Sequence, residues 1–360
     1  MSKIALITDT HWGCRGDSLV FHEYFSKFYN EIFFPYILKN DIKTIIHLGD
    51  IVDRRKFINF VTLNKFRKNF LSPVIDNNID CHFIIGNHDV PYRNSNDINS
   101  MSELLGPMYS DRRVHYYSEP TVLVLDGVQI ALLPWINNSN YNESVEFCKE
   151  TKAQILFGHL EINGFEMYRG LRSEDGISPE TLSLDKFDIV CSGHFHHKST
   201  KNNINYLGTP YEITWHDYND NRGFHIFDTA TRELEFIRNP LKMFHKFWYD
   251  DKDKSFEEIM DVDFLEYQGT CVKVIVQSKT NPYAFDLIMD RIYKSDPFNV
   301  SIVDDNHNMD VLTEEDIVHE AEDTLSILSK YIDHINTSAN KNELKKLFSS
   351  LYNEAHETAV

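Results

Sequence analysis

The chain has 360 residues, of which 42% are hydrophobic and 25% charged, and it carries a formal net charge of −19. This length predicts one large domain with one or two small appendages. No apolar stretch approaches the roughly 18 residues of a membrane span, and so acidic a chain excludes DNA binding through net charge alone.

Five short apolar runs predict β-strands, and each is followed by residues that can bind a metal. The runs are residues 4–7, 44–46, 82–85, 154–157 and 188–191. The blocks that follow them are Asp9-Thr10-His11, Gly49-Asp50, Gly86-Asn87-His88-Asp89, Gly158-His159 and Gly193-His194-Phe195-His196. Continuous apolar runs are typical of parallel strands in an α/β sheet, whose carboxyl ends meet in one crevice. The blocks should therefore converge.

The candidate ligands form a mixed nitrogen and oxygen set: Asp9, His11, Asp50, Asn87, His159, His194 and His196. Such a set suits Mn²⁺, Fe or Zn²⁺ better than the all-oxygen shells that Ca²⁺ and Mg²⁺ prefer. Asp50, at the centre of the set, is the natural bridge between two metals about 3.5–4 Å apart, the spacing of phosphatases and nucleases. One block alone would indicate a turn or a structural histidine. Five blocks in order predict a two-metal hydrolase.

Three further segments predict structure. Residues 57–71 form an unusually aromatic, helix-like stretch, which is either a dimer interface or a core helix. Residues 122–125 and 128–133, joined by Asp126-Gly127, predict a β-hairpin. The strand-dense segment 205–237 predicts the second sheet of a sandwich.

The last third predicts a small module and a helical tail. Residues 270–276, 282–293 and 298–303 indicate a βαβ unit, which either caps the site or is only a structural appendage. A polar linker follows, and Thr313 then offers an N-cap for helices with apolar residues at helical spacing. These helices either dock on a partner or pack locally.

The five cysteines predict no disulfide framework, because they are scattered, odd in number and without a C-x-x-C pair. Cysteines without a disulfide framework are typical of a protein in a reducing compartment. The first predicted strand begins at Ile4 and a candidate ligand stands at Asp9, so a cleaved signal peptide would remove part of the site. The expected location is the cytoplasm.

The order of the blocks, D-x-H, G-D-x-x-D, G-N-H-D, G-H and G-H-x-H, resembles that of the calcineurin-like metallophosphoesterases. Within them the chain is similar to DNA repair nucleases of the SbcD type, and most of all to the nuclease subunits of the recombination endonucleases of T4-like phages. The narrower likeness rests on residues 158–165, 206–210 and 222–227. It covers the first 240 residues strongly and the remainder in pattern only.

The resemblance implies a fold, a domain organisation and roles for the candidate residues. The fold would be an α/β sandwich of two sheets flanked by helices over residues 1–240, with a capping domain over 241–305 and a linker with C-terminal helices over 306–360. One divalent ion would be bound by Asp9, His11, Asp50 and His196, and the other by Asp50, Asn87, His159 and His194. Mn²⁺ is expected, with Mg²⁺ as the alternative. His88 matches a proton donor or phosphate contact oriented by Asp53, although cellular members often carry His at the position of Asp53.

The resemblance also implies a nuclease of recombination and repair that acts on DNA. Its partners would be a second copy of the chain and an SbcC-type ABC ATPase with a coiled coil, docked on the C-terminal helices. The competing functions are a phosphomonoesterase, which would not need the cap and tail, and a non-catalytic scaffold, which would usually lack some of the ligands.

The distribution of charge is compatible with DNA as a substrate. Residues 241–360 hold 12 Lys and Arg against 24 Asp and Glu, which leaves only −7 for residues 1–240. Basic residues next to the site motifs are candidate phosphate contacts: Arg54, Arg55, Lys56, Arg93, Arg112, Arg113, Arg169 and Arg172. The alternative for each is a solvated charged loop.

Overall fold

The computed structural model describes residues 2–92, 94–109, 113–168, 171–173 and 176–304, together with Ile332, Lys341, Leu344, Lys345 and Leu347. The chain divides into two compact units, Met1–His307 and Asn308–Val360. Apart from those five residues, the predicted tail helices lie outside the described part of the chain. Among the described residues, no helix is long and apolar enough to cross a membrane.

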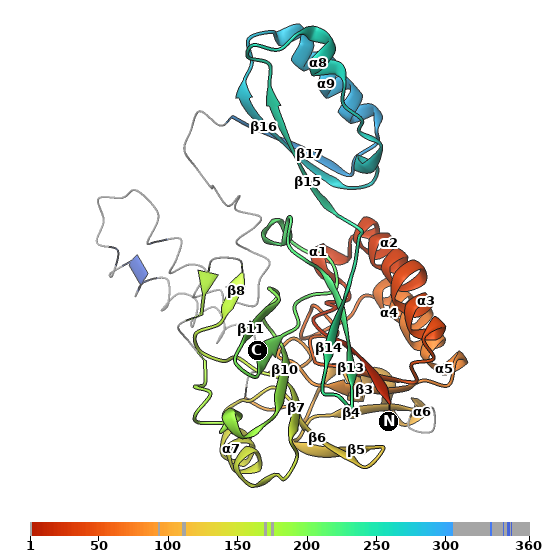
Figure 1. Cartoon of the computed structure of the whole chain (residues 1–360), viewed down its shortest axis with the longest axis vertical. Helices are drawn as coiled ribbons and strands as arrows, with labels where there is room; N and C mark the ends of the chain where they lie inside the picture. The colour runs from red at the N-terminus through yellow and green to blue at the C-terminus, as the bar shows by residue number, and fades with distance from the viewer. Residues whose placement is uncertain are drawn as a thin grey trace. The chain divides into compact units, whose positions relative to one another are not determined.

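Two six-stranded sheets form the body of the first unit (Figure 1). The first has the order β14-β13-β1-β2-β3-β4 and consists of β1 (Lys3–Ile7), β2 (Thr44–His47), β3 (Asp80–Ile84), β4 (Val114–Tyr117), β13 (Gly223–Asp228) and β14 (Leu234–Arg238). The second has the order β11-β12-β10-β7-β6-β5 and consists of β5 (Thr121–Leu125), β6 (Val128–Leu133), β7 (Ile155–His159), β10 (Ile189–Gly193), β11 (Ser199–Lys201) and β12 (Ile204–Tyr206). Buried apolar side chains of both sheets, such as Leu6 and Phe157, form a common core. The predicted two-sheet sandwich is confirmed.

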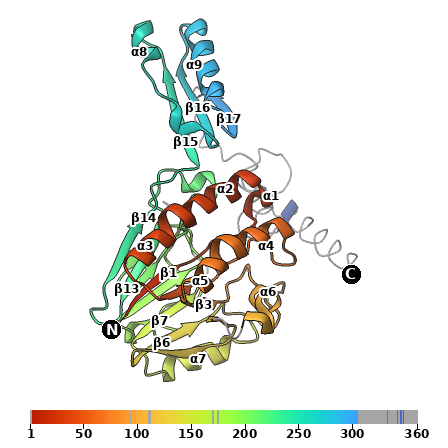
Figure 2. The ribbon, with the colours of Figure 1, turned by 90° about the vertical axis from the view of Figure 1, so that its right-hand side faces the viewer.

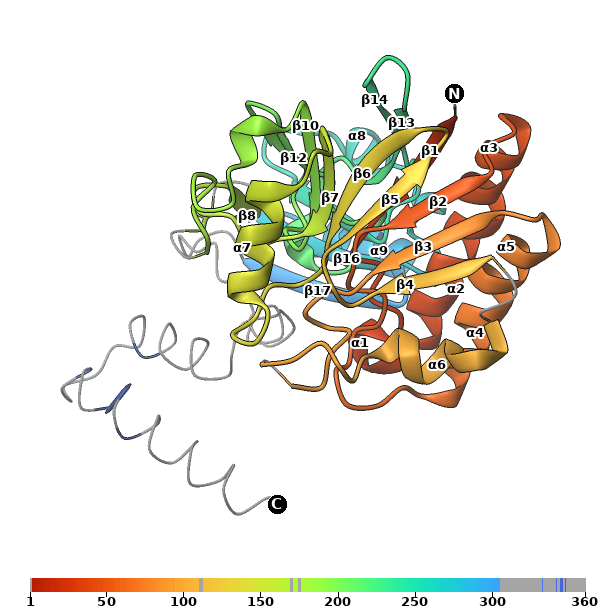
Figure 3. The same cartoon turned by 90° about the horizontal axis from the view of Figure 1, so that it is seen from below.

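Helices flank both sheets (Figures 2 and 3). Those beside the first sheet are α2 (Leu19–Lys27), the π-helical turn η1 (Phe28–Phe33), α3 (Phe34–Lys39), α4 (Phe60–Phe66), the π-helical turn η2 (Arg67–Leu71), α5 (Ser72–Asp76) and α6 (Ser100–Tyr109). The second sheet is flanked by α7 (Tyr141–Glu150). Shorter elements are α1 (Cys14–Asp17), the 3₁₀ turns η3 (Leu184–Lys186) and η4 (Trp215–Asp217), and the ribbon of β8 (Glu166–Tyr168) and β9 (Leu171–Arg172).

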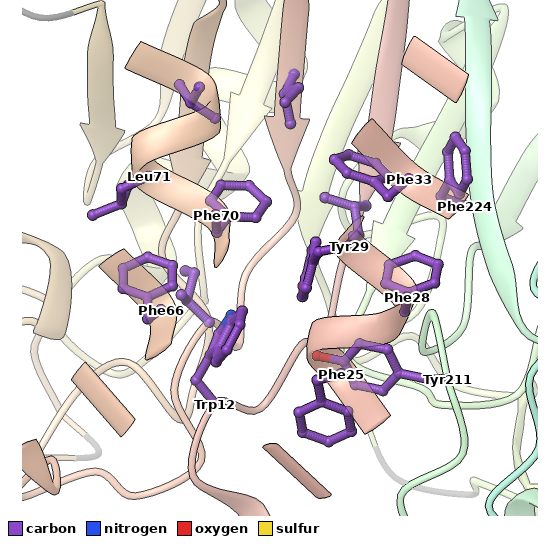
Figure 4. Close-up of a cluster of buried hydrophobic side chains, with 14 of the residues drawn as sticks. Trp12, Phe25, Phe28, Tyr29, Phe33, Phe66, Phe70, Leu71, Tyr211 and Phe224 are labelled. Atoms are coloured by element: carbon purple, nitrogen blue, oxygen red, sulfur yellow. The ribbon is translucent and has the colours of Figure 1, made fainter. Parts of the chain in front are cut away.

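The core between the first sheet and its helices is rich in aromatic rings (Figure 4). The labelled side chains are Trp12, Phe25, Phe28, Tyr29, Phe33, Phe66, Phe70, Leu71, Tyr211 and Phe224. Trp12 stacks on Tyr29 with ring centroids 5.2 Å apart, so the loop after β1 is anchored to this core. The aromatic stretch 57–71 is divided: Phe66 and Phe70 are buried here, whereas Phe60 is 86% exposed.

The hairpin prediction is confirmed, but the sheet predicted for residues 205–237 is wrong for its two longer strands. β5 and β6 pair antiparallel around Asp126 and Gly127, both at positive φ. However, β13 pairs antiparallel with β1 in the first sheet, with Leu6 opposite His225, and β14 pairs with β13. Because side chains on both faces of β13 are buried, its sequence lacks the alternation that would indicate its partner.

A parallel three-stranded sheet follows, formed by β15 (Phe244–Asp250), β16 (Cys271–Ser278) and β17 (Asn299–Asp304) in that order. The helices α8 (Phe256–Met260) and α9 (Pro282–Lys294) lie along one face of it (Figure 1), and the 3₁₀ turn η5 (Leu265–Tyr267) precedes β16. Helix α9 begins where Asn281 accepts a hydrogen bond from the Ala284 amide, with Pro282 in its first turn. The predicted βαβ unit is confirmed, and β15 is an addition that the sequence analysis missed.

Candidate metal centre

Each of the five polar blocks lies at the carboxyl end of a strand, as predicted. Asp9 and His11 follow β1, Asp50 follows β2, Asn87 and His88 follow β3, His159 ends β7, and His194 and His196 follow β10. Strands β1 to β3 belong to the first sheet, and β7 and β10 to the second. Both layers of the sandwich therefore contribute to one site.

The structure brings six of the candidate ligands, together with Asp53 and His88, into three groups, two of which share His11. These are Asp9, His11 and His196; Asp50, His159 and His194; and His11, Asp53 and His88. Within each group the possible ligand atoms all lie within 4.8 Å of one another. Asn87 joins the second group, because its Oδ1 lies 2.9 Å from His159 Nε2 and 3.0 Å from His194 Nδ1.

Asp50 belongs to the second group and also faces the first. Its Oδ1 is 3.4 Å from His159 Nε2, and its Oδ2 is 3.8 Å from His11 Nε2. The two oxygens of one carboxylate thus face different imidazoles. This arrangement allows Asp50 to bind two ions at once, one through each oxygen.

Hydrogen bonds within the chain hold the Asp9 carboxylate in place. It accepts hydrogen bonds from Thr8 Oγ1 at 2.6 Å and from the His194 amide at 3.1 Å. The His11 and His196 Nε2 atoms lie 3.1 Å apart. Asp9 therefore connects the end of β1 to the turn after β10, and the two imidazoles bring ring nitrogens together beside it.

The backbone at the site is strained and tightly packed. Asp9, His11, Asp50 and His194 all have positive φ, at 51°, 42°, 55° and 89°. Residues other than glycine adopt this conformation at an energetic cost, and such residues cluster at functional sites. Glycine is needed at position 86 for another reason, because a Cβ there would lie 2.3 Å from Asp50 Oδ1.

The electrostatics of the site divide its histidines into two kinds. Burial alone would lower the pKa of His11 and of His159, but the neighbouring carboxylates, Asp50 foremost for His159, raise both pKa values to about 9. Burial and the charge of His159 lower the pKa of His194 to about 3. Burial also raises the pKa of Asp9. Because imidazole must be neutral to bind a metal, cations and protons compete at His11 and His159.

These residues fit divalent metal ions. Imidazoles, carboxylates and one amide converge on a buried position from both sheets, a donor set of the kind that binds Mn²⁺, Fe or Zn²⁺. His88 gives a further sign. Its Nε2 is buried and has no hydrogen-bond partner among the described residues, and such an atom calls for a ligand or water.

The contact between His88 and Asp53 differs from the expected one. His88 Nδ1 donates to the main-chain oxygen of Asp53 at 2.6 Å. The Asp53 carboxylate instead lies 3.5 Å from His11 Nδ1. Asp53 thus holds His88 through its backbone, and its side chain is directed toward a candidate ligand.

Two residues that support the site received no role from the sequence. The Asp89 carboxylate is buried and accepts hydrogen bonds from the amides of Asp50, Ile51, Val52 and Gly86 at 2.9–3.3 Å, which ties the turn after β2 to the turn after β3. Its place after Asn87-His88 was the available signal.

Arg222 is the second such residue. It is buried and donates to the His196 main-chain oxygen and to Thr209 Oγ1. Its other guanidinium nitrogen pairs with Asp217 at 2.7 Å and with Asp220 at 2.9 Å. Arg222 thus fixes the loop that carries His196. The only sequence signal for Arg222 was its place in the segment 222–227, on which the narrower family resemblance partly rests.

Some of the candidate DNA-contacting residues form ion pairs with carboxylates of the same chain. Arg54 pairs with Asp17 at 3.0 Å, and the exposed Arg172 lies 4.0 Å from Glu166. Burial lowers the pKa of His88, and the charge of Arg55 makes a small contribution in the same direction. Lys56 is exposed. Arg93, Arg112 and Arg169 lie outside the described residues. Arg113 does not lie beside the site: it pairs with Asp80, at the start of β3, whereas the metal residues follow the end of that strand.

Comparisons with known proteins agree with the geometry. Residues 2–198, more than half of the chain, match the model of the calcineurin-like phosphoesterase family. The chain is 39% identical over 241 residues to exonuclease subunit 1 of Enterobacteria phage T4, covering 67% of each protein.

Among solved structures, a novel archaeal phosphodiesterase matches with a TM-score of 0.34 and 14% identity, over 66% of this chain and 99% of that one. The nuclease MPE of Pseudomonas putida matches with a TM-score of 0.28 and 17% identity, over 57% of this chain and 67% of that one. From the family match and the identity to the phage protein, the chain belongs to the calcineurin-like phosphoesterase family and is a metal-dependent phosphodiesterase.

Proposed function

We propose that the chain is the nuclease subunit of a DNA recombination and repair complex and hydrolyses DNA phosphodiesters at a two-metal site. The observation that carries the proposal is the position of Asp50, whose two oxygens face histidines of two separate ligand groups. The similarity to exonuclease subunit 1 of phage T4 supports DNA as the substrate and a role as one subunit of a complex.

In the proposed site, one ion is held by Asp9, His11, Asp50 and His196, and the other by Asp50, Asn87, His159 and His194. When bound, such ions lower the pKa of water toward about 7 and withdraw charge from the phosphate. We expect Mn²⁺ to serve best, with Mg²⁺ as the alternative, because the donors mix carboxylate and amide oxygens with imidazole nitrogens and do not form an all-oxygen shell.

His88 has the geometry of a proton donor or phosphate contact. Its Nδ1–H donates to the Asp53 main-chain oxygen, so Nε2 carries a proton only when the ring is an imidazolium cation; that proton would then point to the buried side of the ring, where no described residue accepts it. The Nε2–H would donate to the leaving oxygen or to the phosphate. A positioned acid of this kind contributes about 10²–10⁴-fold to the rate.

The test uses the purified full chain with Mn²⁺ and an end-labelled linear DNA duplex. We expect metal-dependent shortening of the DNA, and a loss of about 10²-fold or more in His88→Ala without loss of bound metal, measured by elemental analysis. A generic phosphomonoester serves as the control substrate. If the protein hydrolyses that ester and leaves the DNA intact, it is a phosphatase and not a nuclease. If His88→Ala keeps full activity, His88 does not have the proposed role.

The finer organisation is also proposed. Residues 1–240 would form the nuclease domain, residues 241–305 would cap it, and residues 306–360 would dock an SbcC-type ABC ATPase in the cytoplasm. Deleting the chain from Val311 onward should abolish ATPase binding in a pull-down while metal content is retained. Retention of the ATPase by the truncated chain would contradict the docking role.

A further inference from the structure

We propose that Trp135 is a base-stacking residue, which receives an unpaired nucleobase beside the phosphate held at the metal centre. This inference rests on the proposed nuclease function and adds a substrate preference to it. Aromatic side chains stack on bases whose faces are exposed, as in single strands and frayed ends. The preferred DNA would therefore be unpaired at the cleaved nucleotide.

Trp135 lies beside the second ligand group. Its ring centroid is 5.1 Å from that of His194, with the ring planes tilted by 39°, and 6.1 Å from that of His159. Both imidazoles would bind the same ion. A phosphate at that ion would bring its own nucleoside within reach of the indole.

The indole ring is only half-buried, although the chain around it is buried. The preceding residues Leu133 and Pro134 are buried, and so is Asn137 two positions after it, whereas Ile136 is half-buried. His194, which Trp135 contacts, is also half-buried, so this is an open side of the site. Tryptophan combines a large apolar face with a polar N–H, and it is enriched at interfaces where one part of the side chain is wet.

The backbone of Trp135 is held from two sides. Its amide donates to the Ile85 oxygen at 2.8 Å, directly before the Gly86-Asn87 turn. Its own oxygen accepts hydrogen bonds from the side-chain amides of Asn96 and Asn140, at 2.8 and 3.0 Å. Both asparagines are buried. A ring on so constrained a backbone loses little freedom on binding, which favours affinity.

Packing against His194 would by itself explain the position of the ring. The test must therefore distinguish stacking on a nucleobase from structural support of His194. The full chain is incubated with Mn²⁺ and single-stranded oligonucleotides in which the bases on either side of the cleaved bond are replaced, one at a time, by an abasic analogue. Stacking predicts that the wild type cleaves one abasic oligonucleotide with kcat/KM lowered about tenfold or more. In Trp135→Leu the normal and abasic oligonucleotides should be cleaved equally well.

A second readout does not depend on cleavage. 2-Aminopurine at the same nucleotide loses fluorescence when it stacks on an aromatic ring. With Mn²⁺ present and a non-hydrolysable linkage at the cleaved bond, it should be quenched by the wild type but not by Trp135→Leu. Trp248→Leu is the matched control, because Trp248 is 50% exposed on β15; this variant should behave as the wild type. Asn140→Ala, which keeps the ring and releases its backbone, should weaken the quenching.

Three outcomes are distinguished. Equal discrimination against the abasic oligonucleotide by the wild type and Trp135→Leu, with metal content and quenching unchanged, overturns the stacking role and leaves the nuclease intact. The stacking role is also overturned if Trp135→Leu lowers cleavage of the normal and the abasic oligonucleotide by the same factor. A wild-type chain that binds metal but cleaves no oligonucleotide, alone or with an ATPase partner, removes the proposed function and this inference together.

Discussion

At the scale of single residues, Asp53 contacts two histidines through different atoms. Its main-chain oxygen accepts from His88 Nδ1, and its carboxylate faces His11 Nδ1 at 3.5 Å. A carboxylate on the far nitrogen of a metal-binding imidazole fixes the tautomer and strengthens the ligand. The side chain of Asp53 should therefore matter for metal affinity, and its backbone for the orientation of His88.

Asp53→Asn tests this division of roles. The main-chain contact to His88 survives the substitution, whereas the charge next to His11 is lost. We expect metal affinity to fall about 10–100-fold, measured by calorimetric titration with Mn²⁺, and kcat at saturating metal to stay close to that of the wild type. His88→Ala should do the reverse. If Asp53→Asn lowers kcat at saturating metal as much as His88→Ala does, the carboxylate takes part in proton transfer.

The types of residue at the site could be predicted from the sequence, but their contacts could not. A histidine or aspartate directly after a buried strand must lie at the edge of the sheet, so Asp9, Asp50 and His159 could be placed together before any coordinates. Which atom of Asp53 reaches His88 depends on backbone dihedrals, to which the sequence pattern is insensitive. Arg222 was missed because its partner His196 is 26 residues away in the chain.

At the scale of elements, Glu212 connects the segment after β12 to the start of β15. Its Oε2 accepts hydrogen bonds from the Met243 and Phe244 amides at 2.7 and 2.9 Å, and the side chain is buried. Burial raises the pKa of the carboxyl group to about 7, although the two amides act in the opposite direction. Sequence reasoning missed this contact together with β15.

This pKa has a consequence for stability. In the unfolded chain Glu212 titrates near its ordinary value of 4.5, so the folded protein holds the proton more tightly. The free energy of unfolding should therefore fall as pH rises from 4.5 through 7, by about 1.4 kcal/mol per unit of pKa difference. Urea unfolding of the wild type and Glu212→Gln at pH 5 and pH 8 checks this. The Gln variant should be comparatively more stable at pH 8; a pH-independent difference between the two proteins would contradict the assignment.

Pairing between distant strands was the least predictable part of the fold. The hairpin of β5 and β6 was predicted because two turn residues, Asp126 and Gly127, fix its register. The partner of β13 was not, since Asp228 lies opposite Lys3 and no turn connects the two strands. Local chemistry therefore predicted the existence of strands and the positions of their ends. The order of the strands in the sandwich depends instead on burial across the whole domain.

At the scale of the whole molecule, exposed apolar side chains are grouped around the start of α4. Phe57 and Phe60 are 62% and 86% exposed, and Val61 is 46% exposed. Apolar side chains grouped in this way are a common mark of association. We propose that a second copy of the chain covers them in a symmetric dimer, because an isologous contact lets one apolar patch bury itself.

Phe60→Asp should separate the two copies without unfolding the helix. Phe60 is the first residue of α4, after the cap Asn59, where a negative charge is favourable to the helix dipole. The mass of the full chain in solution, from light scattering after gel filtration, should be that of two chains in the wild type and of one chain in Phe60→Asp. Leu265→Asp is the matched control, since Leu265 is 80% exposed on η5, and it should remain a dimer. A single-chain mass for the wild type, or dissociation by Leu265→Asp alone, would rule out the surface around Phe60 as the contact.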